Sequence, residues 1–179
     1  LAARFILRRN WVRMLVWLLV LAGLIAIVVV SQRQTFPTQA DRTAYAAIAN
    51  TPAVAALTGL PYAAGTLGGI LNIKIWMTDA VALSFAVIFL VTRNGRAEEE
   101  TGRTELLRAG VLGRHAYTAA NWFVVAVFTV VTGLATTGAA IAEGLPGYGA
   151  LVRGASLAGV GLAFLGLAAL GGQLAQTSR

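Results

Sequence analysis

Cysteine is absent from this chain of 179 residues, and histidine and lysine each occur once, as His115 and Lys74. Without cysteine the chain can form neither a disulfide nor a thiolate metal site, and a single histidine leaves little scope for zinc. Acidic side chains are also scarce, with seven Asp and Glu against fourteen Lys and Arg. We therefore expect no metal and no cofactor in this chain.

Sequence motifs of hydrolytic and nucleotide-binding enzymes are missing as well. A phosphate-binding loop requires G-x-x-x-x-G-K-[ST], but the single lysine is followed by Ile75. The motifs H-E-x-x-H, G-x-S-x-G and C-x-x-C do not occur, and no Ser, Cys or acid is placed to form a triad with His115. The sequence predicts that the chain is not an enzyme and that His115 is an interfacial hydrogen-bonding residue.

Apolar residues dominate what remains. They make up 58% of the chain, charged residues make up 12%, and the mean hydropathy is +0.74. In a soluble domain about 25% of the residues are charged. Four apolar runs are long enough to cross roughly 30 Å of hydrocarbon as α-helices. The sequence predicts an all-α membrane protein with about four transmembrane helices in this portion, at residues 11–30, 66–92, 116–142 and 150–170.

Three further segments lie outside the apolar runs. Residues 1–10 are basic and amphipathic, which predicts an elbow helix on the membrane surface. Residues 31–64 contain three of the four prolines and predict a connector with two short helices, which is either a solvated link or an external gate. Residues 171–179 follow the last apolar run and predict a short cytoplasmic tail.

The basic residues predict the orientation of the chain in the membrane. Positive charge concentrates in cytoplasmic loops, and with the N-terminus inside, ten basic residues lie inside and four outside. The inside set is Arg4, Arg8, Arg9, Arg13, Arg93, Arg96, Arg103, Arg108, Arg114 and Arg179, and the outside set is Arg33, Arg42, Lys74 and Arg153. We therefore expect a cytoplasmic N-terminus, and we attribute the net charge of +7 to topology rather than to nucleic-acid binding.

Residues 93–114, RNGRAEEETGRTELLRAGVLGR, form one charged island between the second and third apolar runs. Glu99 and Arg103 stand at i and i+4, which favours a helix. Three consecutive glutamates fall in its first turns, where negative charge meets the positive end of the helix dipole. Spacing alone predicts a solvated cytoplasmic helix that Asn94 and Gly95 would open.

The string R-A-E-E-E-x-G-R-x-E-L-L-R-A-G-V-x-G-R within this island resembles the intracellular loop of permease subunits of ABC-2-type exporters, in the polyketide antibiotic exporter-like branch of high-GC bacteria. The resemblance implies a coupling helix that rests in a cleft of a separate, dimeric ATPase subunit, which would bind ATP and Mg. It also implies export of small lipophilic or amphipathic compounds through a multi-pass protein of the bacterial plasma membrane. The residues expected to contact the ATPase are Glu98, Glu99, Glu100, Gly102, Arg103, Glu105, Leu106, Leu107 and Arg108.

Members of this family are considerably longer than the present chain. The resemblance therefore implies that residues 1–179 are part of a larger transmembrane domain in the lipid bilayer. Further spans of the same chain, or a second permease, would complete the transport pathway.

Asp79 is the acidic residue that falls inside an apolar run. A carboxylate in hydrocarbon is costly and usually faces the protein interior or water. Lys74 is five residues away and about 140° around the helix, so it is a poor partner. Two interpretations stay open: Asp79 pairs with a residue of another span, or it lines the transport path. Alternative functions are a proton-coupled secondary transporter that uses Asp79 and a non-transporting membrane assembly protein.

Small residues at a four-residue spacing predict close helix packing in the third and fourth apolar runs. The two stripes are Thr129, Gly133 and Thr137, and Ala155, Gly159 and Ala163. We expect both stripes to contact neighbouring helices.

Overall fold

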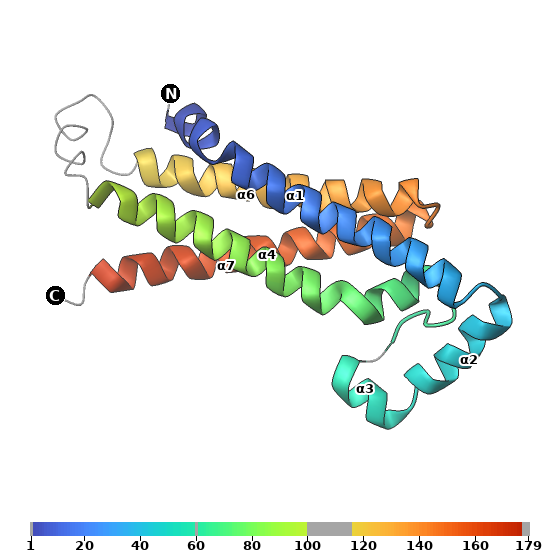
Figure 1. Cartoon of the computed structure of the whole chain (residues 1–179). Coiled ribbons are helices and arrows are strands. Elements are labelled where there is room, and N and C mark those ends of the chain that lie inside the picture. Colours follow the sequence, from blue (N-terminus) through green and yellow to red (C-terminus); the bar gives the residue numbers. More distant parts are fainter. Residues whose placement is uncertain (1, 60, 100–115, 177–179) are drawn as a thin grey trace. The chain divides into compact units, whose positions relative to one another are not determined.

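The computed structural model describes residues 2–59, 61–99 and 116–176 (Figure 1). Throughout that part the chain forms helices joined by short turns, and it contains no strand. The helices are α1 (Ala2–Thr35), α2 (Gln39–Ala49), α3 (Pro52–Thr58), α4 (Leu67–Glu99), α6 (Ala116–Ala142) and α7 (Gly147–Gln176). The predicted all-α class is confirmed.

Four of these helices are long and apolar enough to cross a membrane. Their membrane-compatible parts have mean hydropathies between 1.8 and 2.9 and span Ala3–Thr35, Leu67–Arg93, Tyr117–Ala142 and Gly147–Gly172. Large apolar side chains point outward on them, for example Ile27, which is 68% exposed, and Phe123, which is 65% exposed. Such exposure suits contact with lipid rather than water. The predicted number of spans is confirmed.

The long helices run past the ends that the sequence predicts. α1 is uninterrupted from Ala2 to Thr35, so the described residues before the first predicted span belong to the same helix, although Figure 1 shows the first turns of α1 at an angle to the rest. α4 continues through Asn94 and Gly95 to Glu99, and α7 continues beyond Gly171 to Gln176. A glycine costs a helix interior only about 1 kcal/mol, so these residues need not end a helix.

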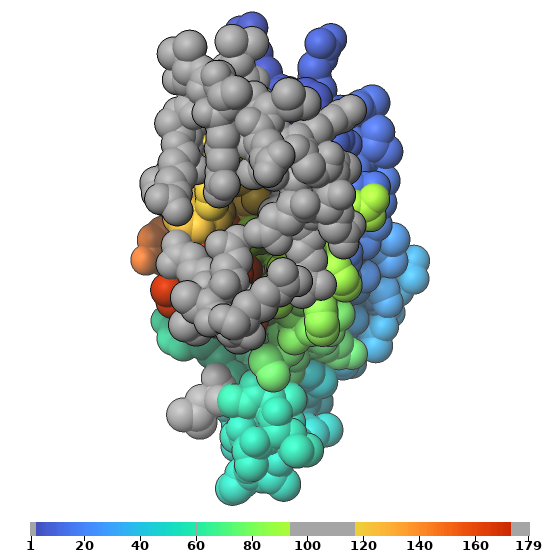
Figure 2. All heavy atoms as spheres, turned by 90° about the vertical axis from the view of Figure 1, so that its left-hand side faces the viewer, coloured from blue at the N-terminus to red at the C-terminus, as the bar shows by residue number. Residues whose placement is uncertain are grey.

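The connector between α1 and α4 contains α2 and α3, whose residues are coloured cyan to turquoise in Figure 2. α2 begins with a capping box, in which the Thr38 hydroxyl accepts from the Asp41 amide at 3.2 Å and the Asp41 carboxylate accepts from the Thr38 amide at 3.0 Å. α3 has Pro52 at its first position and ends before Gly59, whose φ of 81° suits glycine.

The chain divides into two compact units, and each of the four long helices contributes residues to both. The first unit comprises the described parts of Leu1–Trp17, Ala80–Val131 and Leu157–Arg179. Within it, a methyl group added at Gly161 of α7 would lie 3.0 Å from Thr129 Cβ of α6 and 3.1 Å from Leu83 Cδ2 of α4. Glycine at this position therefore allows three helices to approach one another closely.

The second unit comprises the described parts of Leu18–Asp79 and Thr132–Ser156. Its apolar core draws on all four long helices and on the turn after α6, through Ile25, Val29, Leu71, Ile75, Ala140, Leu145 and Ala150. In that turn the Arg33 guanidinium of α1 donates to the carbonyl oxygen of Glu143, and Gly144 has a φ of 75°. α1 is thereby joined to the turn between α6 and α7.

Candidate functional site

The predicted contact with an ATPase lies mostly outside the described residues. Glu98 and Glu99 are the last two residues of α4. The other seven predicted contact residues, from Glu100 to Arg108, fall in the range that the structure does not describe. The coupling helix therefore stays a prediction.

The buried carboxylate predicted at Asp79 is part of an ion pair between two spans. Its Oδ2 accepts from Nη2 of Arg153, which lies on α7, 74 residues further along the chain. Asp79 is fully buried and Arg153 is 5% exposed. Of the two interpretations left open by the sequence, pairing with another span is the one that the structure shows.

A second polar contact joins the same two helices within the second unit. The Trp76 indole of α4 donates to the Ser156 hydroxyl of α7 at 3.2 Å, and that hydroxyl donates to the Arg153 carbonyl oxygen at 2.7 Å. Trp76 and Asp79 stand at i and i+3 on α4, as Arg153 and Ser156 do on α7, so each pair occupies one helix face. We call these four residues the interhelical clamp.

The two contacts of the clamp cross each other. α4 and α7 run in the same direction (Figure 1), yet the earlier residue of α4, Trp76, binds the later residue of α7, Ser156. The later residue of α4, Asp79, binds the earlier residue of α7, Arg153. Crossed contacts oppose sliding of the helices along each other in either direction, because any slide lengthens one of the two.

The ion pair is costly to separate in this environment. Asp79 Oδ1 and Arg153 Nε and Nη1 are buried and have no hydrogen-bond partner in the described part of the chain. Each charge therefore depends on the other for its compensation. Removing one partner of a buried ion pair typically costs about 3–5 kcal/mol, because the remaining charge stays buried and unpaired.

α6 and α7 pack closely in the second unit, next to the clamp in sequence. Thr137 Oγ1 lies 2.9 Å from the Gly133 carbonyl oxygen of its own helix and 3.2 Å from the Ala150 carbonyl oxygen of α7. A methyl group added at Gly154 would overlap Thr137 Oγ1 and the Gly133 carbonyl oxygen. Gly133 and Thr137 thus lie at a helix contact, and their counterpart on α7 is Gly154.

The second predicted stripe does not pack against the described helices. Ala155, Gly159 and Ala163 are exposed, and a methyl group at Gly159 would meet no atom within 4 Å in the described part of the chain. The buried face of α7 is instead formed by Ala150, Arg153, Gly154, Leu157, Gly161 and Leu165. The physical reason is the ion pair. Arg153 must face inward to reach Asp79, and this orientation of α7 points residues 155, 159 and 163 outward.

No protein-family model matches the chain. Over 115 residues the chain is 38% identical to a multidrug efflux system permease protein of Mycobacterium tuberculosis, a match that covers 63% of this chain and 21% of that protein. The chain is a homologue of an efflux permease. The predicted resemblance to ABC-2-type permeases is thereby supported, and the four spans make the chain a multi-pass protein of the cell membrane.

The matched region spans about a fifth of the length of that relative. The activity, cargo and partners of the whole protein are therefore matters for proposal. The homologue is a permease, which agrees with the prediction that this chain is a membrane subunit rather than an enzyme.

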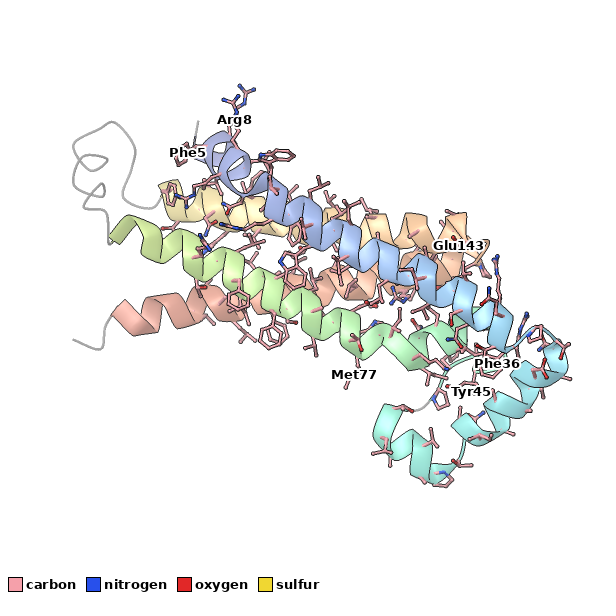
Figure 3. The ribbon with its side chains drawn as sticks, in the orientation of Figure 1. Phe5, Arg8, Phe36, Tyr45, Met77 and Glu143 are labelled. Atoms are coloured by element: carbon pink, nitrogen blue, oxygen red, sulfur yellow. The ribbon has the colours of Figure 1, made fainter. Side chains whose placement is uncertain are left out.

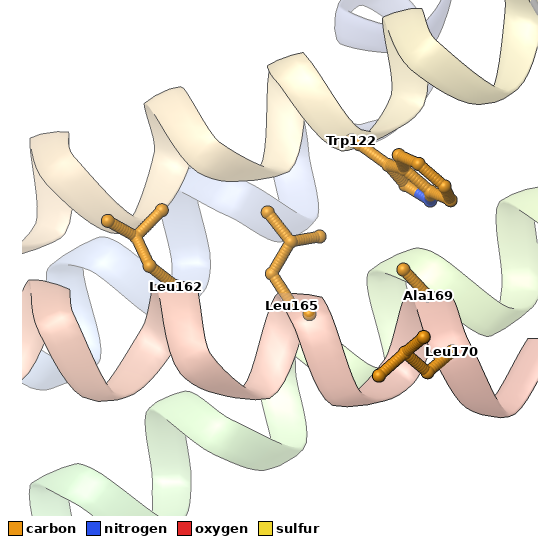
Figure 4. A pocket seen from close by; sticks show the side chains of 6 residues that line it. Trp122, Leu162, Leu165, Ala169 and Leu170 are labelled. Carbon is orange, nitrogen blue, oxygen red and sulfur yellow. The ribbon is translucent and has the colours of Figure 1, made fainter.

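An apolar hollow of about 480 Å³ lies in the first unit, between α6 and α7 (Figure 4). Trp122 of α6 lines it together with five residues of α7, which are Leu162, Leu165, Gly166, Ala169 and Leu170. Its walls are aliphatic apart from the indole ring. A hollow of this composition suits a hydrocarbon chain or ring rather than a charged group.

Lys74, which the predicted topology places on the outer side of the membrane, contacts two aromatic rings of the connector. Its ammonium lies 5.5 Å from the ring centroid of Phe36 and 5.8 Å from that of Tyr45, and the two rings lie side by side (Figure 3) with centroids 5.0 Å apart. Burial raises the pKa of the Tyr45 phenol above its ordinary value. Cation–π contacts therefore hold the connector against the start of α4.

Proposed function

We propose that this chain forms part of the membrane-spanning permease of an ATP-driven exporter. The exporter moves small lipophilic or amphipathic compounds out of a bacterial cell. The observation that carries this proposal is the similarity to a multidrug efflux permease over 115 residues, together with four apolar helices of membrane-spanning length. The apolar hollow beside Trp122 suits a cargo of this kind.

In the proposed exporter, energy enters through a separate ATPase subunit, as the resemblance of the charged island to the intracellular loop of ABC-2-type permeases implies. That subunit binds ATP and Mg, and residues 93–114 form the coupling helix that rests on it in the cytosol. The acidic and basic side chains of this segment make charge-assisted hydrogen bonds to the ATPase, and Leu106 and Leu107 anchor the segment through apolar contact. Because α4 leads directly into this segment, ATP-driven movement of the ATPase reaches the spans through α4.

The alternative of a proton-coupled transporter requires a carboxylate that exchanges protons during transport. Asp79 is instead buried against Arg153. A path-lining role for Asp79 would need a conformation in which this pair is open. The pairing therefore gives no support to proton exchange by Asp79 in this conformation.

Glu99→Lys tests the coupling role. The complete exporter is purified with its ATPase in mild detergent and reconstituted in liposomes, and transport and ATP turnover are measured together. We expect the variant to insert normally and to hydrolyse ATP, but to lose about tenfold or more of its transport per ATP, since coupling energies of this kind reach about 2 kcal/mol.

Glu143→Lys is the matched control, because it makes the same charge change at the turn after α6, on the opposite side of the membrane in the proposed topology. It should keep normal transport. If no nucleotide-binding protein co-purifies with the wild-type chain, or if transport collapses with the proton gradient and ignores ATP, the ATP-driven function is wrong.

A further inference from the structure

The clamp differs from the hydroxyl contacts further along α4. The hydroxyl of Ser84 donates to the Ala80 carbonyl oxygen at 2.7 Å, and that of Thr92 donates to the Ile88 carbonyl oxygen at 2.8 Å. Both bonds stay within one helix, and the hydrogen bond from Asn121 Nδ2 of α6 to the Val91 carbonyl oxygen of α4 is long, at 3.5 Å, and uncharged. The clamp residues bond across to α7 instead, in two places one turn apart.

We propose that Arg153, Trp76 and Ser156 are positioning residues, which together with Asp79 hold α4 and α7 in fixed register throughout the transport cycle. The two helices then move as one body. This inference rests on the proposed function and adds the element that passes the movement of α4 to α7.

The charges of Asp79 and Arg153 make the contact between α4 and α7 harder to break than the contact between α6 and α7. The contact between α6 and α7 at Gly133, Thr137 and Gly154 is close but carries no charge. Sliding at that contact exchanges one set of van der Waals contacts and weak hydrogen bonds for another. Separating Asp79 from Arg153 would leave two unpaired charges in hydrocarbon, with no other described partner for either. α7 therefore follows α4 when α4 moves against α6, a movement that would break the neutral 3.5 Å hydrogen bond from Asn121 Nδ2 to the Val91 carbonyl oxygen.

The clamp joins α7 to the helix that leads into the charged island, so a fixed register passes movement of α4 on to α7. α4 leads into the charged island, so the ATP-driven movement of the ATPase reaches α4 directly. α7 follows α6 in the chain. Without the clamp, the movement would reach α7 through the turn at residues 143–146. With the clamp closed, a shift of α4 carries α7 and its apolar outer face along. The size of the space bounded by α6 and α7 then changes with every movement of the ATPase.

The first test asks whether transport needs the ion pair itself or the individual charges at positions 79 and 153. Asp79→Asn and Arg153→Gln each break the ion pair, and the exchange Asp79→Arg with Arg153→Asp restores it in reverse. In liposomes that contain the complete exporter and its ATPase, we expect each single variant to lose about tenfold in transport per ATP hydrolysed. The exchange variant should recover most of that ratio. Ser84→Ala is the control for loss of a polar group within α4 and should keep the wild-type ratio.

The second test leaves both charges in place, so that it stands even if the single variants fail to insert. Trp76→Cys and Ser156→Cys are combined in a background without other cysteines, to which this chain contributes none. A short bifunctional thiol reagent then links them, and the single-cysteine variants treated in the same way serve as controls. Both positions are partly or fully exposed, so the reagent can reach them.

A clamp that stays closed predicts that the linked protein keeps at least about half of the transport rate of the unlinked double variant. Loss of transport with continued ATP hydrolysis would show that α4 and α7 must separate, and this result would overturn the inference while leaving the ATP-driven function intact. Failure of the exchange variant to recover its ratio, with a changed KM for cargo, would assign the pair to the transport path instead. If the wild-type complex shows no ATP-driven transport, the proposed function fails and the inference fails with it.

Discussion

Two glycines of α7 predict opposite effects of the same substitution. A methyl group added at Gly154 would overlap backbone of α6 at Gly133, whereas one added at Gly159 would meet no atom within 4 Å in the described part of the chain. Both glycines lie in the interior of one helix, so the gain in helix propensity on substitution by alanine, about 1 kcal/mol, is common to both. The difference between the two variants therefore reports the packing of α7 against α6.

The size of the difference follows from what the added methyl group meets. A backbone carbonyl cannot rotate aside, so α6 and α7 must move apart to accept alanine at Gly154. Overpacking of this kind costs roughly 1–3 kcal/mol. After the propensity gain is subtracted, Gly154→Ala should lower the free energy of unfolding by about 0–2 kcal/mol, and Gly159→Ala should raise it by about 1 kcal/mol. A gap of this size corresponds to several degrees in Tm, at roughly 2–4 °C per kcal/mol.

Thermal unfolding of the complete protein in one detergent, followed by tryptophan fluorescence, measures this difference. The two variants are compared with each other and with the wild type at equal lipid content. We expect Gly154→Ala to unfold at the lower temperature and Gly159→Ala at or above the wild-type temperature. Equal shifts of the unfolding temperature, of the same sign, would refute the assignment of the buried face of α7. Destabilisation confined to Gly159→Ala would instead support the buried face that the small-residue spacing predicts.

Three other outcomes are expected. Lys74→Gln removes the cation–π contacts with the connector, worth about 0.5–1 kcal/mol each, so limited proteolysis of the connector should quicken, whereas Lys74→Arg should behave like the wild type. Hydrogen bonds from Thr38 hold the pKa of Asp41 below its ordinary value, so the capping box stabilises α2 above the unfolded pKa and loses that effect as the pH falls through the lowered folded value. Hydrogen exchange of α2 should accelerate in that acidic range, and Asp41→Asn should remove the pH dependence. Gly166→Leu should fill the apolar hollow and raise the KM for lipophilic cargo without lowering Tm, and Gly171→Leu, outside the hollow, should leave the KM unchanged.

The number of spans could be predicted from the sequence because apolar length is a local property. Each run needs only enough consecutive apolar residues to cross the hydrocarbon, and all four runs have them. The ends of the helices were harder to predict. Asn94, Gly95 and Gly171 are weak helix formers, but each costs a helix interior only about 1 kcal/mol or less, and a helix that has already formed can continue through them.

The partner of Asp79 could not be predicted because it depends on tertiary register. Arg153 stood near the predicted outer end of the fourth span, where a cation can reach the interface unaided, so nothing local called for a partner. The buried face of α7 was missed for a related reason. Small residues occur all around this helix, so their spacing fits several faces equally well. The one cation among them was the signal that could have identified the inward face.

The pairing of Asp79 with Arg153 also places a demand on biosynthesis. The carboxylate enters the membrane with α4, and its partner is synthesised 74 residues later. At about 5–20 residues per second the ribosome needs roughly 4–15 s to supply it. During that interval α4 carries an uncompensated acidic group, which favours its retention at the insertion machinery until α7 arrives. Nascent chains halted before Arg153 should therefore be preferred substrates of membrane quality control.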